Sequence, residues 1–456
     1  MVIQNKYLAQ QILPLFEDIK VKNAHIEPRD FPSSEDFEAK DISQTNTTST
    51  FSDNLSLPIH RWFRYPAGFS ANWVHDIIAR EKSKGRTRVL DPFSGSGTVL
   101  LESEHCGVDS IGIEAHPFVA RVAKAKLYWK QDPKNFHAYA LSILERARNT
   151  KADIDNAPEL LKKCYPPEVL MFLNSLRMAW ELSADGSPFS ELTWLALVSI
   201  LRQCSPVGTA QWQYILPKKS KSKVIDPYLA FEARVALMSI DMTKRQSQNH
   251  ASKAVVHWGD ARECSQIPEG WANLIVTSPP YANNYDYADA TRLEMNFFGE
   301  IEGWGDLQEA VRKYLIRSCT QHVGKISKET DKIIADPLLK PIRGELTEVC
   351  HQLEKEKENH GGRKQYNTMV AAYFSDLAHV WQALRRITSE DALVCFVIGD
   401  SAPYGIHVPV DKWLGDLAIA SGFKTYFFEK TRDRNVKWKN RKHTVPLHEG
   451  YLWIEG

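Results

Sequence analysis

Seven short apolar runs alternate along the chain with longer segments of helical periodicity, and this alternation restricts the fold more than any other feature. Most of the runs are apolar over several consecutive residues, as in strands that are buried on both faces of a sheet. Strands that alternate with helices form a mostly parallel sheet covered by helices on both faces. We therefore predict an α/β fold with a seven-stranded sheet, whose strands are RTRVLDP, DSIGIEA, AVVHWGD, ANLIVTSPP, ALVCFVIGD, KTYFFEK and EGYLWIE.

Between these strands lie helices and two long connections. Residues 127–248 and 298–366 are too long for ordinary crossovers, and we interpret both as insertions into one sheet domain. The first 56 residues are polar, with a Ser/Thr-rich patch at residues 41–54, which is typical of an arm or linker. The clearest helix is predicted over residues 368–387, where one face carries Val370, Phe374, Leu377, Trp381 and Leu384 at a 4-3-4-3 spacing.

Composition excludes several classes of protein. No apolar stretch reaches the roughly 18 residues that span a bilayer, and the N-terminus lacks the features of a signal peptide, so we expect a cytoplasmic protein. The seven cysteines contain no C-x-x-C pair, which argues against a disulfide framework and against a structural zinc site. The net charge of +1 offers no global attraction to nucleic acid. Basic runs at residues 218–223 and 432–443 are typical of solvated loops when nothing else supports binding.

The stretch DPFSGSGT, residues 91–98, follows the first predicted strand and leads into a helix that should end at Gly107. The next strand ends at Glu114, nineteen positions beyond Gly95. In a doubly wound sheet the ligand lies at the carboxyl ends of the strands, where glycines allow a close approach of the backbone. An acidic residue about 20 positions further on accepts hydrogen bonds from ribose hydroxyls. This spacing predicts a nucleotide-type cofactor site.

Three cofactors compete for this site. A phosphate-binding P-loop requires G-K-[ST], but Gly97 is followed directly by Thr98. A dinucleotide fingerprint requires a third glycine where Leu100 stands, which weakens the case for NAD. S-adenosylmethionine has no pyrophosphate and needs only the tight turn and the acidic residue, so it fits best. A plain strand, turn and helix without a ligand stays open for this stretch alone.

A second motif follows the fourth predicted strand, and it completes a resemblance. The third strand ends in Gly259-Asp260, and the fourth ends in Ser278-Pro279-Pro280-Tyr281. Taken with DPFSGSGT, the loop SPPY resembles the catalytic loop (D/N/S)-P-P-(Y/F/W) of the amino-methyltransferase family of DNA-modifying enzymes. In that family the serine form is most often associated with N4 of cytosine, and the Asp and Asn forms with N6 of adenine.

This resemblance covers residues 58–127 and 255–456 and implies a Rossmann-like fold that uses S-adenosylmethionine. It implies that Glu114 binds the ribose and Asp260 the adenine amino group of the cofactor. Residues 64–70 are similar, more weakly, to the family's loop over the methionine end; a plain turn before a helix explains them equally well. The implied cofactor residues are Asp91, Phe93, Gly95, Gly97, Thr98, Glu114 and Asp260, and the implied catalytic loop is Ser278, Pro279, Pro280 and Tyr281.

The chemistry of an exocyclic amine gives the loop a physical purpose. Such an amine is a poor nucleophile because its lone pair is delocalised into the ring, and acceptors aimed at its hydrogens free that pair. The Ser278 hydroxyl and the Pro279 carbonyl are candidate acceptors, held rigid because proline fixes φ, and Tyr281 offers a face for stacking. Good orientation supplies ~7–11 kcal/mol. Neither a covalent intermediate nor a metal is needed, and the sequence contains no Pro-Cys pair of the cytosine-C5 kind.

A base inside a duplex must be flipped out to reach such a loop. Tyr285 and Tyr287 follow the loop closely, and two interpretations stay open for them: walls of a base pocket, or packing residues at the start of a helix. Residues 432–443, between the last two strands, gain interest as a loop that contacts phosphates.

We therefore predict a DNA methyltransferase that acts on N4 of cytosine in double-stranded DNA, within a restriction–modification or related defence system and beside a cognate restriction or defence protein. The same chemistry on N6 of adenine is the main alternative. RNA as substrate, a non-catalytic DNA-binding module and an NAD-dependent oxidoreductase are weaker ones. The predicted division is an arm (1–56), a cofactor-binding half (57–126), a helical insertion favoured for target recognition (127–248), a catalytic-loop region (249–297), a second insertion (298–366) and the remaining sheet (367–456).

Overall fold

The structure is a computed structural model that describes residues 51–65, 68–209, 214–221, 224–248, 251–434 and 445–456. Several sequence predictions fall partly outside these ranges. They concern most of the N-terminal arm, two residues of the 64–70 loop, the end of the first basic run and most of the second.

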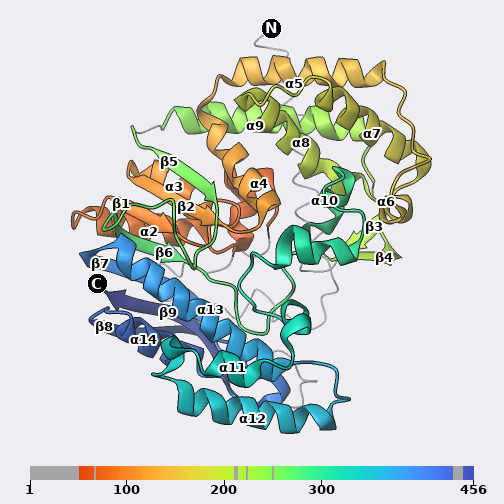
Figure 1. The fold of residues 1–456 in the computed structure, drawn as a ribbon. Coiled ribbons are helices and arrows are strands. Elements are labelled where there is room, and N and C mark those ends of the chain that lie inside the picture. Colours follow the sequence, from red (N-terminus) through yellow and green to blue (C-terminus); the bar gives the residue numbers. More distant parts are fainter. Residues whose placement is uncertain (1–50, 66–67, 210–213, 222–223, 249–250, 435–444) are drawn as a thin grey trace, which may run out of the picture.

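A seven-stranded sheet occupies the left side of the molecule in the view of Figure 1, and it contains the seven strands that the apolar runs predict. Its order is β5-β2-β1-β6-β7-β9-β8. All neighbours are parallel except that β9 runs antiparallel to both β7 and β8, so the α/β prediction with a mostly parallel sheet is confirmed. The strands are β1 (Arg88–Asp91), β2 (Asp109–Glu114), β5 (Ala254–Trp258), β6 (Ala272–Thr277), β7 (Thr388–Gly399), β8 (Thr425–Arg434) and β9 (Leu447–Glu455).

Helices cover both faces of the sheet because successive strand residues point to opposite sides. In β1, Val89 packs into a core with α2 (Ala71–Lys82), whereas Leu90 packs into a core with α13 (Tyr366–Ile387) and α14 (Val410–Ala420). The helix α13 is the one predicted over residues 368–387, and its whole apolar stripe is buried. Near-continuous burial explains why the strands read as unbroken apolar runs.

The connection from β2 to β5 forms a helical unit above the sheet in the view of Figure 1. Its helices share one core with α4, which follows β2. A two-stranded hairpin, β3 (Val207–Thr209) with β4 (Ile215–Ser220), extends from it. The helices are α4 (Pro117–Leu127), α5 (Pro133–Arg148), α6 (Glu159–Cys164), α7 (Pro167–Glu181), α8 (Pro188–Cys204) and α9 (Pro227–Gln246).

The connection from β6 to β7 ends in α13, and two of its other helices, α11 (Thr330–Ile334) and α12 (Arg343–Asn359), lie beside α13 toward the lower edge of Figure 1. It also contains α10 (Arg292–Phe297). Among the described helices of the chain, none combines the length and the apolar character that a membrane crossing requires.

The strand order reverses direction between β1 and β6. After β1 the chain passes through α3 (Thr98–Cys106) to β2 on one side, and after β6 it passes to β7 on the other. Ligands of open α/β sheets bind in the crevice outside the carboxyl ends of the strands at such a switch point. The loops after β1 and β6 are therefore the first place to look for a site.

Candidate functional site

The loops that carry the two motifs leave the sheet at the same edge, because β1 and β6 are neighbours with Leu90 opposite Ile275. A hydrogen bond joins the two strand ends. The hydroxyl of Thr277, the last residue of β6, donates at 2.6 Å to Oδ1 of Asp91, the last residue of β1. The structure thus brings together the Gly-x-Gly turn and the SPPY loop.

The turn after β1 uses two glycines in left-handed conformations. Gly95 has φ +51° and Gly97 has φ +88°, and Gly97 caps the N-terminus of α3. L-residues with side chains rarely adopt this region. A Cβ at residue 95 would also lie 3.1 Å from Cε1 of Tyr65, whose ring covers the turn. The turn therefore needs glycine for its backbone angles and for this close contact.

Two buried carboxylates flank this turn. Asp91 is 1 % exposed, and its Oδ1 also accepts from the backbone N–H of Phe93. Its Oδ2 has no hydrogen-bond partner among the described residues. At the end of β2, Glu114 accepts from the backbone N–H groups of Gly95 at 2.7 Å and His116 at 2.8 Å. Burial raises the pKa of both carboxyls to about 7.

Two further predicted cofactor residues, Asp260 and Phe93, are held by side chains from other parts of the fold. Asp260 lies just beyond β5, the neighbour of β2, and its carboxylate is held by the guanidinium of Arg262 at 2.6 Å. Arg262 also contacts Asp376 of α13, which fixes its direction. Phe93 is half-buried and meets Phe396 of β7 edge to face. Sequence reasoning missed Arg262, although it stands only two positions after Asp260.

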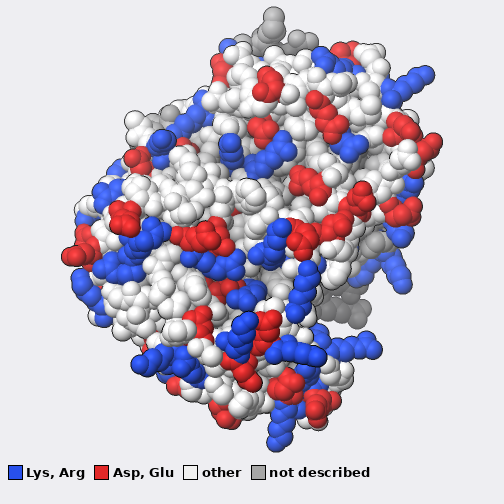
Figure 2. All heavy atoms as spheres, viewed as in Figure 1, with Lys and Arg blue, Asp and Glu red and all other residues white. Residues whose placement is uncertain are grey.

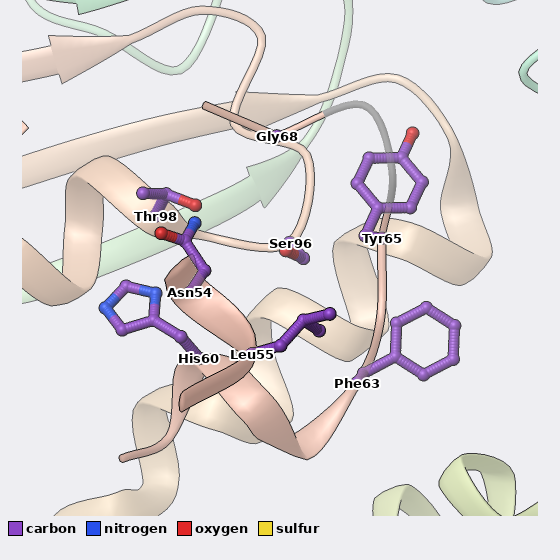
Figure 3. Close-up of a pocket in the computed structure, with 8 residues that line it drawn as sticks. All are labelled: Asn54, Leu55, His60, Phe63, Tyr65, Gly68, Ser96 and Thr98. Atoms are coloured by element: carbon purple, nitrogen blue, oxygen red, sulfur yellow. The ribbon is translucent and has the colours of Figure 1, made fainter. Parts of the chain in front are cut away.

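A small pocket lies on the outer side of the Gly-x-Gly turn (Figure 3), where Ser96 and Thr98 face the segment before α2. Tyr65 and Gly68 come from the loop that was compared with the family's methionine-end loop. Two short helices, η1 (Phe51–Ser56) and η2 (His60–Trp62), supply Asn54, Leu55 and His60, and Phe63 directly follows η2. The part of that loop which the structure describes therefore does lie against the turn.

The SPPY loop continues directly from β6. Ser278 is half-buried, and its hydroxyl donates a 3.2 Å hydrogen bond to the carbonyl of Val397 on β7. Pro279 is buried and Tyr281 is half-buried. The Ser278 hydroxyl donates its hydrogen to Val397 and also interacts with the hydroxyl of Tyr281, and its oxygen can accept a hydrogen bond.

Arg434, at the end of β8, holds the ring of Tyr281. Its Cζ lies 5.1 Å from the ring centroid, and its Nη1 donates at 2.7 Å to the carbonyl of Asp400. The guanidinium crosses the backbone at Gly399, where a Cβ would lie 2.7 Å from Nη1. Its Nε is 3.9 Å from the carboxylate of Glu449 on β9. The sequence signal for Arg434 was its place in a basic run, but its contacts are internal.

The segment after SPPY is anchored by a buried ion pair. Asp286 lies between Tyr285 and Tyr287 in sequence and pairs with Arg312 at 2.7 Å, with side-chain exposures of 4 % and 2 %. The backbone N–H of Asp286 donates at 2.7 Å to the hydroxyl of Tyr214. Arg312 belongs to the second insertion and Tyr214 to the first, so both insertions contact this segment.

The two tyrosines themselves form a pair with ring centroids 4.4 Å apart. Tyr285 is buried and Tyr287 is half-buried against the helical core of the first insertion. Sequence reasoning singled out both rings but missed Asp286 and Arg312.

The basic runs need a correction. Residues 218–220 belong to strand β4 and not to a loop, and Lys221 donates to the carbonyl of Arg202 at 2.6 Å. In the second run, Arg432 and Arg434 lie in β8, and Arg432 pairs with Glu449 at 2.7 Å. Backbone pairing in hairpins extends these strands into sequence that charge alone marks as loop. Over the face in Figure 2, Lys and Arg are interspersed with Asp and Glu.

Comparison with known proteins gives one match to a protein family. The family is described as DNA methylase, of the N6 and N4 type, and its model matches residues 5–125. This range contains the Gly-x-Gly turn and Glu114, and it begins in the N-terminal segment that lies outside the described residues.

Curated relatives extend the similarity over most of the chain. The Type II methyltransferase M.AvaI of Nostoc sp. PCC 7120 is 27 % identical over 82 % of this chain and 81 % of its own length. M.BsoBI of Geobacillus stearothermophilus is 26 % identical over 91 % and 86 %. M.MvaI of Kocuria varians is 20 % identical over 88 % and 90 %. No solved structure matches the chain with statistical significance.

Proposed function

Because the chain belongs to the amino-methyltransferase family of DNA methyltransferases, we propose that it transfers a methyl group from S-adenosylmethionine to N4 of cytosine in DNA. The observation that carries the proposal is the meeting of two loops at one switch point. Two buried carboxylates and a glycine turn follow β1 and β2, and Ser278 follows the adjacent β6. One loop suits the methyl donor and the other suits an amine acceptor.

The residues around the turn fit this cofactor. The unpartnered Oδ2 of Asp91 is an acceptor for the ammonium group at the methionine end. Each oxygen of Glu114 accepts one backbone N–H and keeps capacity for ribose hydroxyls. Asp260 has a side chain that is 28 % exposed, and Arg262 orients it toward a role in binding the adenine amino group. The bound cofactor supplies an activated methyl group on its sulfonium.

The SPPY loop would prepare the acceptor amine. The Ser278 hydroxyl and the Pro279 carbonyl accept its two hydrogens, which favours a pyramidal nitrogen with a free lone pair. The hydrogen bond from Ser278 to Val397 aims the hydroxyl lone pairs away from the sheet. Tyr281, braced by Arg434, stacks on a base that has been flipped out of the duplex. The two rigid loops then hold the amine in line with the methyl group, so the transfer needs no acid–base or metal catalysis.

Adenine N6 is the second candidate, since a serine hydroxyl accepts a hydrogen bond from either amine. The serine form of the loop favours cytosine through its family association. The relatives are Type II methyltransferases, which supports a restriction–modification setting and a cognate endonuclease as partner.

A transfer assay tests the enzymatic proposal. The full chain is incubated with S-adenosylmethionine labelled in the methyl group and with unmethylated genomic DNA. Label is expected in DNA and not in RNA of matched composition. A folded sample that binds the cofactor but labels neither polymer would refute the proposal.

Cofactor affinity is expected to fall as the pH drops through 7, because the raised pKa values of Asp91 and Glu114 make both carboxylates neutral below that value. The ionised form of Glu114 accepts hydrogen bonds from the ribose hydroxyls. At a pH one unit below the pKa of Glu114, the affinity for the cofactor should therefore be about tenfold lower. The measurement is a cofactor titration by calorimetry between pH 6 and pH 8. Glu114→Gln should bind more weakly at pH 8 and depend less on pH. An unchanged pH profile in this variant would argue against a role for Glu114.

Arg434→Met is expected to lower kcat about tenfold, as the loss of a cation–π contact of ~1–2 kcal/mol predicts. The cofactor Kd should stay within twofold, because Arg434 contacts Tyr281 and not the glycine turn. Steady-state kinetics separate kcat from KM. Arg432→Met is the matched control, since Arg432 lies in β8 like Arg434 but pairs with Glu449 of β9. Equal losses in both variants would show that Arg434 does not position Tyr281.

A further inference from the structure

A cluster of histidines surrounds a buried carboxylate between α2 and α3, away from the SPPY loop. Glu102 of α3 has a side chain that is 6 % exposed, and its Oε2 lies 3.1 Å from Nδ1 of His75 and 3.1 Å from Nδ1 of His105. Its other oxygen lies 2.8 Å from Nε2 of His60. The proposed methyl transfer uses none of these groups.

Two of the three separations between the donor atoms are close to those of a tetrahedral metal site. Zinc bonds of about 2.0–2.1 Å to nitrogen and oxygen place two ligand atoms roughly 3.3 Å apart. The two observed separations are 3.1 Å, and the donor atoms of His75, Glu102 and His105 all lie within 4.8 Å of one another. The Sγ of Cys106 is 3.5 Å from Nδ1 of His75. Small side-chain movements are enough to enclose an ion.

The surroundings also suit a metal. The side chains of His75 and His105 are 36 % and 32 % exposed, so an ion can enter from solvent. His60 fixes the ligating carboxylate from behind, as a second partner of a metal ligand commonly does. Glu102 and His105 are one turn apart on α3 and therefore share a helix face. The sequence has no C-x-x-C pair, so cysteine spacing gives no sign of this site.

We propose that His75, Glu102 and His105 bind one divalent transition-metal ion of the zinc class, with the fourth position taken by the Cys106 thiolate or by water. Two imidazoles and a carboxylate beside a thiol favour zinc over magnesium or calcium, which prefer oxygen ligands. The ion would tie α2 to α3.

These are the two helices that start beside the glycine turn, at Ser70 and Gly97, so the expected role is stabilisation of the cofactor half. His60 also lines the pocket in Figure 3, which connects the cluster to the same region.

Direct zinc titration tests the proposal on the untagged full chain after treatment with EDTA and gel filtration. Zinc chloride is titrated against a chromophoric chelator that competes for the ion. One equivalent is expected to bind, and excess zinc should raise Tm by at least ~2 °C. Magnesium should do neither. Hydrogen bonding to Glu102 without a metal is the competing explanation, and the absence of stoichiometric zinc binding would establish it.

Variants identify the ligands. His75→Gln and His105→Gln should each weaken zinc binding at least tenfold and abolish the rise in Tm, while their Tm in EDTA stays near that of the wild type. His351→Gln, an exposed histidine on α12, is the matched control and should bind zinc like the wild type. Zinc binding that survives both ligand variants would overturn the assignment. If a variant unfolds in EDTA, the wild-type titration alone decides whether an ion binds.

Discussion

Replacing Ser278 by alanine is expected to lower kcat for methyl transfer by about 10²–10³, the cost of one preorganised polar group at a reacting atom. The hydroxyl is fixed by its bond to Val397, so its loss removes an acceptor that needs no rearrangement during the reaction. The cofactor Kd should change by less than about twofold, because the glycine turn and its carboxylates keep their contacts. Single-turnover rates and a cofactor titration measure the two quantities.

Ser389→Ala is the matched control for this variant. Ser389 lies at the opposite end of β7 and bonds only to the nearby carboxylate of Asp391, so kcat should be unchanged. A normal kcat in Ser278→Ala would remove the serine from the mechanism. A large loss of cofactor affinity in the same variant would place its role in binding instead.

Arg312→Leu is expected to reduce the free energy of unfolding by about 3 kcal/mol, the low end of the usual cost of breaking a buried ion pair, because Asp286 keeps His322 at 3.4 Å as a second partner. Asp286 would keep its position between the two tyrosines but lose its bidentate guanidinium. Denaturant unfolding followed by circular dichroism measures the change. Because the pair links the second insertion to the segment after SPPY, the variant should also lower kcat.

The neighbouring residue provides the control for Arg312. Lys313 pairs with Glu309 on the surface, where both side chains are well exposed, and Lys313→Leu should change stability by at most ~1 kcal/mol. Adding Asp286→Asn to Arg312→Leu should restore part of the lost stability, since it removes a buried charge that has lost its main partner. Similar losses in Arg312→Leu and Lys313→Leu would contradict the importance of the buried pair.

The sequence predicted the sheet well because its strands are buried. All seven apolar runs form strands, and the helix over residues 368–387 forms α13, since both signals come directly from burial in the core. The β3–β4 hairpin was missed because it is short and polar, with β3 only three residues long. Lys218 and Lys219 lie inside β4, at an irregularity in its pairing with β3, and their charge does not reveal a strand.

The glycine turn and the SPPY loop were visible in the sequence because each combines glycines or prolines with a polar side chain. Their partners were not visible. Arg434 reaches Tyr281 from a distant strand, Arg312 reaches Asp286 from the second insertion, and Tyr65 covers the turn. Such pairs depend on three-dimensional proximity and leave no local pattern. A charged residue within an aromatic segment, as in Tyr-Asp-Tyr, was the one available hint of a buried ion pair.

Identifying the methylated nucleoside is the most direct test of the proposed transfer to N4 of cytosine. DNA methylated by the purified chain is digested to nucleosides and analysed by mass spectrometry, with the Ser278→Ala protein as the blank. We expect N4-methylcytosine in the wild-type digest and at most a trace in the blank. N6-methyladenine as the product would contradict the assignment of the SPPY loop to cytosine.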